Sequence, residues 1–265
     1  MIIKYNNGKV FVLENKSFLD KNKYMSSLFY IDAKVLNEVN LKNYVLKVIN
    51  NDKELIGLKV EPYNLLLYGA KECLKELLEY LNDNDYEYKG VMCSTEIGEE
   101  LIKVAKDIIR KDYFLKIGMD FMEATECFEE SANEVKVASS ADLDDIYHNS
   151  ISFIKDCGLT DKVDKDKIAK RLSNYRVFKI DGKVVSMAAF SYDTIDSLRI
   201  THVYTVPKYR GKGYARKVVN AVKNEIILMG KIATLNVDQA NPISNHLYKS
   251  LGFKKVFSQG IYDLK

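Results

Sequence analysis

Arg210-Gly211-Lys212-Gly213-Tyr214-Ala215 is the stretch of sequence that most constrains the fold. A predicted strand from Leu198 to Val206 precedes it, and a segment with helical spacing of apolar residues follows from Gly213 to about Met229. The first turn of a helix has unpaired N–H groups at the positive end of its dipole, so it binds phosphate well. The two glycines let the backbone approach an anion closely. The stretch predicts a phosphate-binding turn.

The charge around this stretch supports the same interpretation. Between Pro207 and Lys231 the basic residues are Lys208, Arg210, Lys212, Arg216, Lys217, Lys223 and Lys231, and the acidic one is Glu225. A local cationic excess suits a polyphosphate ligand, whereas the alternative is a solvated helix face. The stretch lacks the Lys-Ser/Thr of a P-loop and the third glycine of the dinucleotide motif. On its own it fits an ordinary tight turn equally well.

A second patterned segment begins at Asn241. Asn241 is a favourable N-cap, Pro242 suits the first helical position, and Gly252 lies just past the predicted end. Asn245 and Tyr248 follow Asn241 by four and seven residues, so all three lie near one face of a short helix. Capping alone would explain Asn241, and packing alone would explain Tyr248.

With both segments, the sequence resembles the GNAT superfamily of N-acetyltransferases. Arg210, Gly213 and Ala215 match the family's Arg/Gln-x-x-Gly-x-Gly/Ala signature, and residues 241–253 match its second signature of Asn, Tyr and Leu-Gly-Phe. The resemblance is strong over residues 203–253 and looser over residues 134–265. It implies an α/β fold with a mixed central sheet, the GNAT acyl-CoA N-acyltransferase fold.

The resemblance also implies an activity: transfer of acetyl from acetyl-CoA to a primary amine of a small molecule or peptide, by direct attack in a ternary complex. The main chain of residues 203–205 would hold the acetyl and pantetheine part, and backbone N–H groups of residues 211–216 would hold the pyrophosphate. Asn241 would bind the pantetheine arm, and Tyr248 would protonate the departing thiolate. The implied cofactor-binding residues are Val203, Tyr204, Thr205, Arg210, Gly211, Lys212, Gly213, Tyr214, Ala215, Arg216, Asn241, Asn245 and Tyr248.

The general base is where the sequence departs from the family pattern. Many relatives carry a glutamate on the fourth or fifth strand, and here Asn236 occupies the expected place on the fifth. His202, Asp238 or a chain of waters could take its role, although a strand histidine is more often a structural hydrogen-bonding group. The missing acid leaves a catalytically silent acyl-CoA-binding regulatory protein as the alternative. Transfer of a longer acyl chain, or transfer to a hydroxyl, also stays open.

The predicted domain boundary lies between Glu123 and Asn133, where the apolar periodicity breaks. It divides the chain into an N-terminal α/β domain, residues 1–130, and a catalytic domain, residues 131–265. In the first, strands at 65–68, 91–93 and 113–119 alternate with helices, which favours an α/β layer with parallel strands at crossovers. Some GNAT proteins resemble this arrangement, with a degenerate first copy of the fold. We expect a domain without cofactor that shapes the acceptor cleft or makes an oligomer contact, such as a homodimer; an unrelated α/β domain is the alternative.

Other elements follow from local patterns. Residues 135–138 and 232–237 predict strands, residues 253–262 predict a final strand or hairpin, and residues 141–155 and 164–174 predict helices. Asp181-Gly182 predicts the turn of a hairpin. Ser140 and Thr95 are predicted to cap the helices that follow them.

Composition narrows the class of protein. The chain has 265 residues, 47% of them hydrophobic, and a net charge of +3, which does not point to nucleic acid. It has no run of about 18 apolar residues, so no membrane association is expected. The first residues do not resemble a signal peptide, so we expect a cytoplasmic protein. The four cysteines and three histidines lack metal-ligand spacing, so we expect no metal and mostly buried, reduced thiols.

Overall fold

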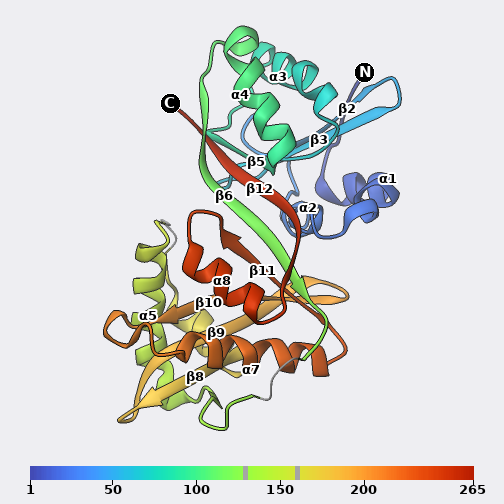
Figure 1. The fold of residues 1–265 in the computed structure, drawn as a ribbon. Coiled ribbons are helices and arrows are strands. Elements are labelled where there is room, and N and C mark those ends of the chain that lie inside the picture. Colours follow the sequence, from blue (N-terminus) through green and yellow to red (C-terminus); the bar gives the residue numbers. More distant parts are fainter. Residues whose placement is uncertain (128–130, 159–161) are drawn as a thin grey trace. The chain divides into compact units, whose positions relative to one another are not determined.

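The computed structural model describes residues 1–127, 131–158 and 162–265 (Figure 1). The predicted boundary at residue 130 falls on residues 128–130, which lie outside the described residues. The described residues form two compact units. The first comprises Met1–Phe121, Asp238–Ala240 and Phe257–Lys265, and the second comprises Met122–Val237 and Asn241–Val256.

The same order of helices and strands occurs twice along the chain. The first series is β1 (Ile2–Lys4), α1 (Gly8–Leu19), α2 (Ser27–Ala33), β2 (Tyr44–Asn50), β3 (Lys53–Lys59), β4 (Leu65–Gly69), α3 (Leu74–Asp83), β5 (Gly90–Ser94), α4 (Thr95–Ile109) and β6 (Tyr113–Ala124). The second is β7 (Lys136–Val137), α5 (Leu143–Asp156), α6 (Lys165–Ala169), β8 (Tyr175–Ile180), β9 (Lys183–Thr194), β10 (Ser197–Thr205), α7 (Tyr214–Leu228), β11 (Ile232–Asp238), α8 (Pro242–Ser250) and β12 (Lys254–Leu264). The predicted α/β fold with a mixed sheet is confirmed, and the first half repeats the second.

The first unit is a mixed sheet covered on both faces. Its strands pair in the order β1-β2-β3-β4-β5-β12. The pairs are antiparallel except that β4 runs parallel to β5, as the predicted crossover requires. Side chains alternate between the faces: Leu46 packs with α3 and α4, whereas Val45 packs with α1 and α2.

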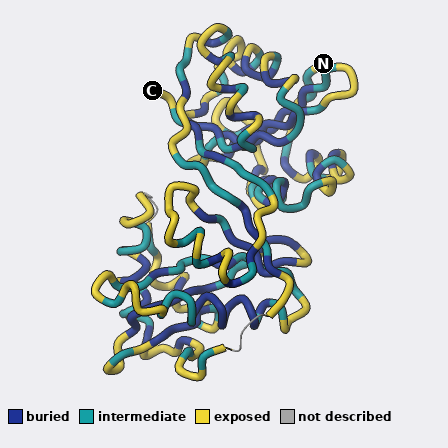
Figure 2. Tube along the Cα trace, in the orientation of Figure 1, coloured by how far each residue is buried: buried dark blue, intermediate teal, exposed yellow. Residues whose placement is uncertain are grey.

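The second unit has the same layered construction. β7, β8, β9 and β10 form antiparallel neighbours, and β10 runs parallel to β11. Asp181 and Gly182 both have positive φ, 48° and 76°, as the predicted hairpin turn needs. On β9, Val184 and Met187 pack with α5 and α6, while Val185 and Ala188 pack with α7. Most of α7 is buried between this sheet and its other neighbours (Figure 2).

The ends of β6 and β12 lie in cores that are built mainly from the other half of the sequence. Met122 and Ala124, at the end of β6, are in the core that contains α7. Residues 259–263 of β12 pair with β5 in the first unit, where Tyr262 is buried against α4. A Cβ atom on Gly98 would lie 1.8 Å from the Tyr262 ring. A single cut in the chain therefore does not separate the two compact units.

Two predicted helix caps are wrong by one residue. Ser139, not Ser140, forms a capping box with Asp142, because residues 140–142 already make a 3-10 turn that leads into α5. Ser94, not Thr95, caps α4: its Oγ accepts a hydrogen bond from Ile97 N at 3.4 Å. In both cases the residue in extended backbone conformation just before the turn is the one that can bond back to the first N–H groups.

The helix predicted over residues 164–174 is shorter than expected. Asp164 caps α6, which ends at Ala169, and residues 172–174 form a separate 3-10 turn. Arg171 between them has φ −125°, which is outside the helical range. Ile168 is the buried side chain of α6, so little apolar burial is available to extend the helix.

Candidate cofactor and acyl-transfer site

A β-bulge interrupts β10 just before the predicted phosphate loop. The pairing of β10 with β9 changes register between Thr201 and Tyr204, and His202 adopts φ 51°. Ile200 packs on the α7 side of the sheet, but Tyr204, four residues later, packs on the α5 side. Residues four apart in a regular strand share a face, so the bulge reverses the direction of the following side chains.

The strands β10 and β11 stop pairing before the bulge is reached. Their parallel ladder joins residues 197–199 to residues 232–234, whereas β10 continues to Thr205 and β11 to Asp238. In the described ladders the end of β10 pairs with β9 alone, through Tyr204 and Thr205. Its other edge therefore presents backbone groups that can bind an extended, amide-containing ligand. This is where the pantetheine contacts of residues 203–205 were predicted.

The loop after β10 forms an open cradle at the start of α7. Gly211 and Gly213 have φ 76° and 79°, and a Cβ atom on either would meet no described atom within 4 Å. Gly213 is the N-cap of α7, so no side chain caps the helix, and no acidic residue lies in its first turn. The N–H groups of Tyr214 and Ala215, in the first turn, therefore face no side-chain cap and can bind an anion. The cradle fits a pyrophosphate.

The corresponding junction in the first unit is closed. A Cβ atom on Gly69, at the end of β4, would lie 2.2 Å from Glu54 O. The turn that enters α3 carries Glu72, and α3 itself carries Glu76 in its first turn. Backbone packing and negative charge both disfavour an anion here.

The predicted cations of the loop have different roles. Arg210 Nε donates to Thr205 O at 2.9 Å, and its terminal nitrogen donates to Asp156 Oδ2 at 2.6 Å. Arg210 therefore ties the loop to β10 and to the end of α5. Lys208 and Lys212 are exposed, with their Nζ atoms 5.0 and 5.5 Å from the Tyr209 ring centre. These two lysines carry positive charge that a phosphate can reach.

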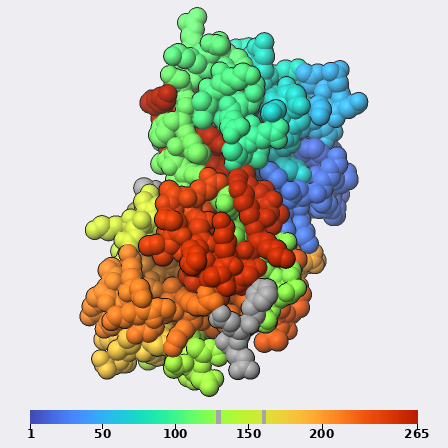
Figure 3. Space-filling model, viewed as in Figure 1, coloured from blue at the N-terminus to red at the C-terminus, as the bar shows by residue number. Residues whose placement is uncertain are grey.

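The polar residues of α8 act as caps in this structure. Asn241 Oδ1 accepts a hydrogen bond from Ser244 N at 3.0 Å, and Asn245 Nδ2 donates to Asn241 O at 2.9 Å. The capping interpretation of Asn241 is therefore observed, and its Nδ2 group takes no part in that cap. Asn241 is exposed and Asn245 is half-buried. The C-terminal segment to which α8 belongs is red in Figure 3.

Tyr248 lies on the inner face of α8. Its side chain is buried, and its ring meets that of Phe253 edge-on at 6.0 Å between centres. Burial, with a smaller contribution from Cys157, raises the pKa of the Tyr248 phenol well above its ordinary value. The hydroxyl is therefore protonated at neutral pH, as a general acid must be.

His202 lies at the bulge between two aromatic rings. Its ring centre is 5.5 Å from that of Phe153 on α5 and 5.9 Å from that of Tyr175 on β8. Its Nδ1 is 3.1 Å from Thr201 Oγ1. Burial lowers the pKa of His202 below its usual 6.5, and the charge of Arg171 lowers it further. The imidazole is therefore neutral at pH 7 and can accept a proton.

The other two side chains considered for the base differ in their chemistry. Asn236 lies half-buried on β11 and cannot take up a proton. Asp238 Oδ1 accepts a hydrogen bond from Ala240 N at 2.8 Å, and this residue belongs to the first unit. Of the three side chains, His202 and Asp238 can accept a proton and Asn236 cannot.

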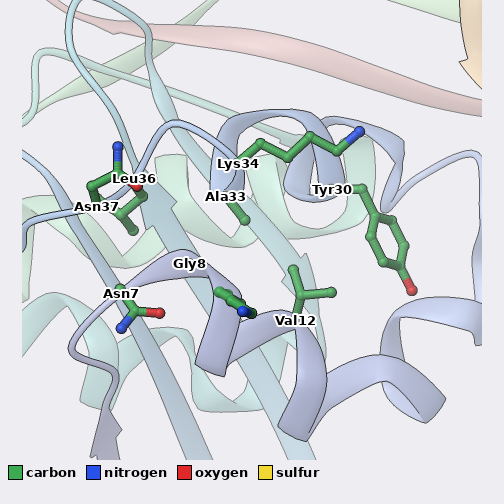
Figure 4. Close-up of a pocket in the computed structure, with 9 residues that line it drawn as sticks. Asn7, Gly8, Val12, Tyr30, Ala33, Lys34, Leu36 and Asn37 are labelled. Atoms are coloured by element: carbon green, nitrogen blue, oxygen red, sulfur yellow. The ribbon is translucent and has the colours of Figure 1, made fainter.

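The first unit has a surface hollow of its own, of about 570 Å³, between α1 and α2 (Figure 4). Val12, Ala33 and Leu36 provide apolar lining, and Asn7 and Tyr30 provide polar groups. None of the predicted cofactor-binding residues lines it.

The described residues contain no group of three or more His, Cys, Asp or Glu that could hold a metal ion. No helix in the described part of the chain is long and apolar enough to cross a membrane. Cys73 and Cys93 are buried and Cys127 and Cys157 are exposed, so the expectation of mostly buried thiols is right for two of the four.

Comparison with known proteins identifies the fold. The family model of FR47-like proteins matches residues 180–260, and no curated protein matches the chain. An acetyltransferase of the GNAT family from Colwellia psychrerythraea is similar over 100% of this chain and 98% of its own, at 12% identity and a TM-score of 0.65. A tandem GNAT protein from the clavulanic acid biosynthesis pathway has the same coverage at 6% identity and a TM-score of 0.58.

A GCN5-related N-acetyltransferase from Kribbella flavida is similar over 82% of this chain and 88% of its own, at 12% identity and a TM-score of 0.57. At these identities the likeness establishes the fold, and the FR47-like match covers the loop, α7 and α8. The chain therefore has the fold of the GNAT acetyltransferases, and its residues 180–260 are similar to FR47-like proteins.

Proposed function

We propose that the second unit transfers acetyl from acetyl-CoA to a primary amine of a small molecule or peptide. The observation that carries the proposal is the open, uncapped start of α7 between Gly211 and Gly213. It supports anion binding because backbone N–H groups and a helix dipole converge there, and no side chain caps the helix. The unpaired edge of β10 supports binding of the pantetheine amides.

The proposed reaction is direct attack in a ternary complex, with acetyl-CoA supplying the activated thioester. The amine nitrogen forms a bond to the acetyl carbon as the carbon–sulfur bond breaks. His202 accepts the proton that the amine loses, and Tyr248 gives a proton to the leaving sulfur. The lowered pKa of His202 and the raised pKa of Tyr248 keep each group in the protonation state that its role requires.

Isothermal titration with acetyl-CoA tests the binding step, and thiol release in the presence of amines tests transfer. A panel of amino acids, polyamines, aminoglycosides and short peptides covers the open acceptor classes. Failure of the intact protein to bind acetyl-CoA would contradict the proposal.

Replacing His202 with asparagine tests the proposed base. Asparagine tolerates the positive φ at this position but cannot take up the proton. We expect kcat/KM to fall by roughly 100-fold. In the wild type, protonation of His202 at low pH removes the base. The acid limb of the kcat/KM profile should therefore lie at the His202 pKa, which is below 6.5. The variant should lose this acid limb in a profile measured between about pH 5 and pH 8. An unchanged acid limb would assign the base to another group.

A silent acyl-CoA-binding regulatory protein is the second candidate function. Asn236 in place of an acid favours it, since that position cannot act as a base. Acetyl-CoA binding without thiol release across the whole amine panel would support this function. The same assay with longer acyl-CoA donors and with alcohols would separate the remaining chemistries.

We propose that the N-terminal domain, residues 1–130, binds no cofactor and serves the acceptor side or an oligomer contact such as a homodimer. The closed junction at Gly69 and the acidic residues that follow it support this role. Titration of acetyl-CoA into the wild type should give one site per chain, and two equivalent sites would contradict the proposal.

A further inference from the structure

Two basic side chains of α7 bond to the C-terminal end of α8. Lys223 Nζ donates to Leu251 O at 3.0 Å. One terminal nitrogen of Arg216 donates to Ser250 Oγ at 2.7 Å, and the other lies 3.4 Å from Ser250 O. Arg216 is in the first turn of α7, beside the glycine cradle, and Lys223 is seven residues later. Seven residues are two helical turns, so the two side chains leave α7 from the same face.

These bonds complete the hydrogen bonding of the last turn of α8. The carbonyl oxygens of residues 247–249 accept hydrogen bonds from backbone N–H groups of Leu251, Phe253 and Gly252. The next two carbonyls, of Ser250 and Leu251, accept from Arg216 and Lys223. Carbonyls at a helix C-terminus have no partner within the helix, and cations near them also interact favourably with the dipole.

The burial of Lys223 shows that this contact is an integral part of the second unit. Its side chain is completely buried, 0% exposed, within the stretch of α7 that packs in the core. Burying an ammonium group is costly unless polar partners receive its hydrogen bonds. An apolar residue would fill this position at lower cost, so the lysine is explained by what it binds, which includes the end of α8.

We infer that Arg216 and Lys223 position Tyr248 for proton donation by fixing the end of α8 to α7. Tyr248 lies two residues before Ser250 and three before Leu251, so this clamp acts within one turn of the phenol. The same helix, α7, forms the proposed anion cradle with its N-terminus. One rigid element thus sets the separation between the phosphate contacts and the acid. The inference rests on the proposed acyl-transfer function.

Lys223→Met and Ser250→Ala test the clamp from its two sides, and neither changes the backbone of the cradle. Each should lower kcat by about tenfold, since small misplacements of a catalytic group are costly, while the Kd for acetyl-CoA changes by less than about threefold. The decisive measurement combines each variant with Tyr248→Phe. If the clamp acts through the phenol, the double variants should lose no more kcat than Tyr248→Phe alone.

Lys217→Met is the matched control. Lys217 adjoins Arg216 on α7, but its Nζ bonds to Glu134 at 2.9 Å. The control should keep the kcat of the wild type. Thermal unfolding checks the fold of every variant, and Ser250→Ala carries the test alone if Lys223→Met does not fold.

Additive losses in the double variants, or an unchanged kcat in the single ones, would overturn the inference while leaving the proposed function intact. A wild-type protein that releases no thiol with any amine of the panel would instead remove the proposed function, and the clamp's catalytic role with it.

Discussion

Gly213→Glu should weaken acetyl-CoA binding by at least about 100-fold, or about 2.7 kcal/mol, in isothermal titration. At φ 79° any side chain other than glycine is strained, at a cost of about 1–2 kcal/mol. The new carboxylate would extend into the open cradle, where it would occupy the anion position and repel the pyrophosphate. A carboxylate at a helix N-terminus also stabilises the unliganded helix, which offsets part of the strain. The protein should therefore stay folded while it loses its ligand.

Gly182→Glu is the control for backbone strain. Gly182 has φ 76° and the same open surroundings, but it lies in the β8–β9 hairpin. Its variant should show a similar loss of unfolding free energy and unchanged acetyl-CoA affinity. Equal weakening by the two substitutions would mean that strain, rather than the cradle, explains the loss.

Tyr248→Phe should lower kcat by roughly 100-fold to 10,000-fold, the usual contribution of a general acid. The change removes one hydroxyl and keeps the buried ring against Phe253, so acetyl-CoA affinity and thermal stability should change little. Steady-state thiol release and isothermal titration would measure the two effects separately. Tyr192→Phe, at an exposed position on β9, is the control and should have no effect. Full activity in Tyr248→Phe would assign the proton to another donor.

The pH dependence gives an independent test of this acid. A general acid loses its function as the pH rises through its pKa, and burial raises the pKa of Tyr248 above the ordinary tyrosine value of 10. The alkaline fall of kcat should therefore begin above about pH 10. An alkaline limb at neutral pH would contradict the assignment.

The elements with strong local signals were predictable from sequence. Asp181-Gly182 predicts its hairpin because few residues tolerate two successive positive φ angles, and the apolar stripe of α7 predicts that helix. Helix α1, by contrast, was not predicted. Leu13 is 77% exposed there, whereas Asn15 is buried with its Nδ2 donating to Phe11 O. The spacing of apolar residues in α1 therefore does not indicate which face of the helix is buried.

The residues of the candidate site were predictable only where a short stretch of sequence carries the signal. The glycines of the cradle and the start of α8 are local signals, and the structure has them as expected. The bulge at His202 and the early end of the β10–β11 ladder depend on pairing between distant strands. Lys223 was predicted as part of a local cationic excess near the phosphate site, with a solvated helix face as the alternative. In the structure the residue is completely buried and bonds to Leu251, which is far from it in the chain.

The place of β12 in the first unit has a consequence for how the protein is made. Tyr262 and the paired end of β12 belong to the core of the first unit, yet they follow the residues of the second unit in the chain. The nascent N-terminal half cannot close its sheet beside β5 until the second unit and β12 have been synthesised. A fragment that ends at residue 130 should therefore be unstable in isolation, and a peptide containing β12 should rescue it.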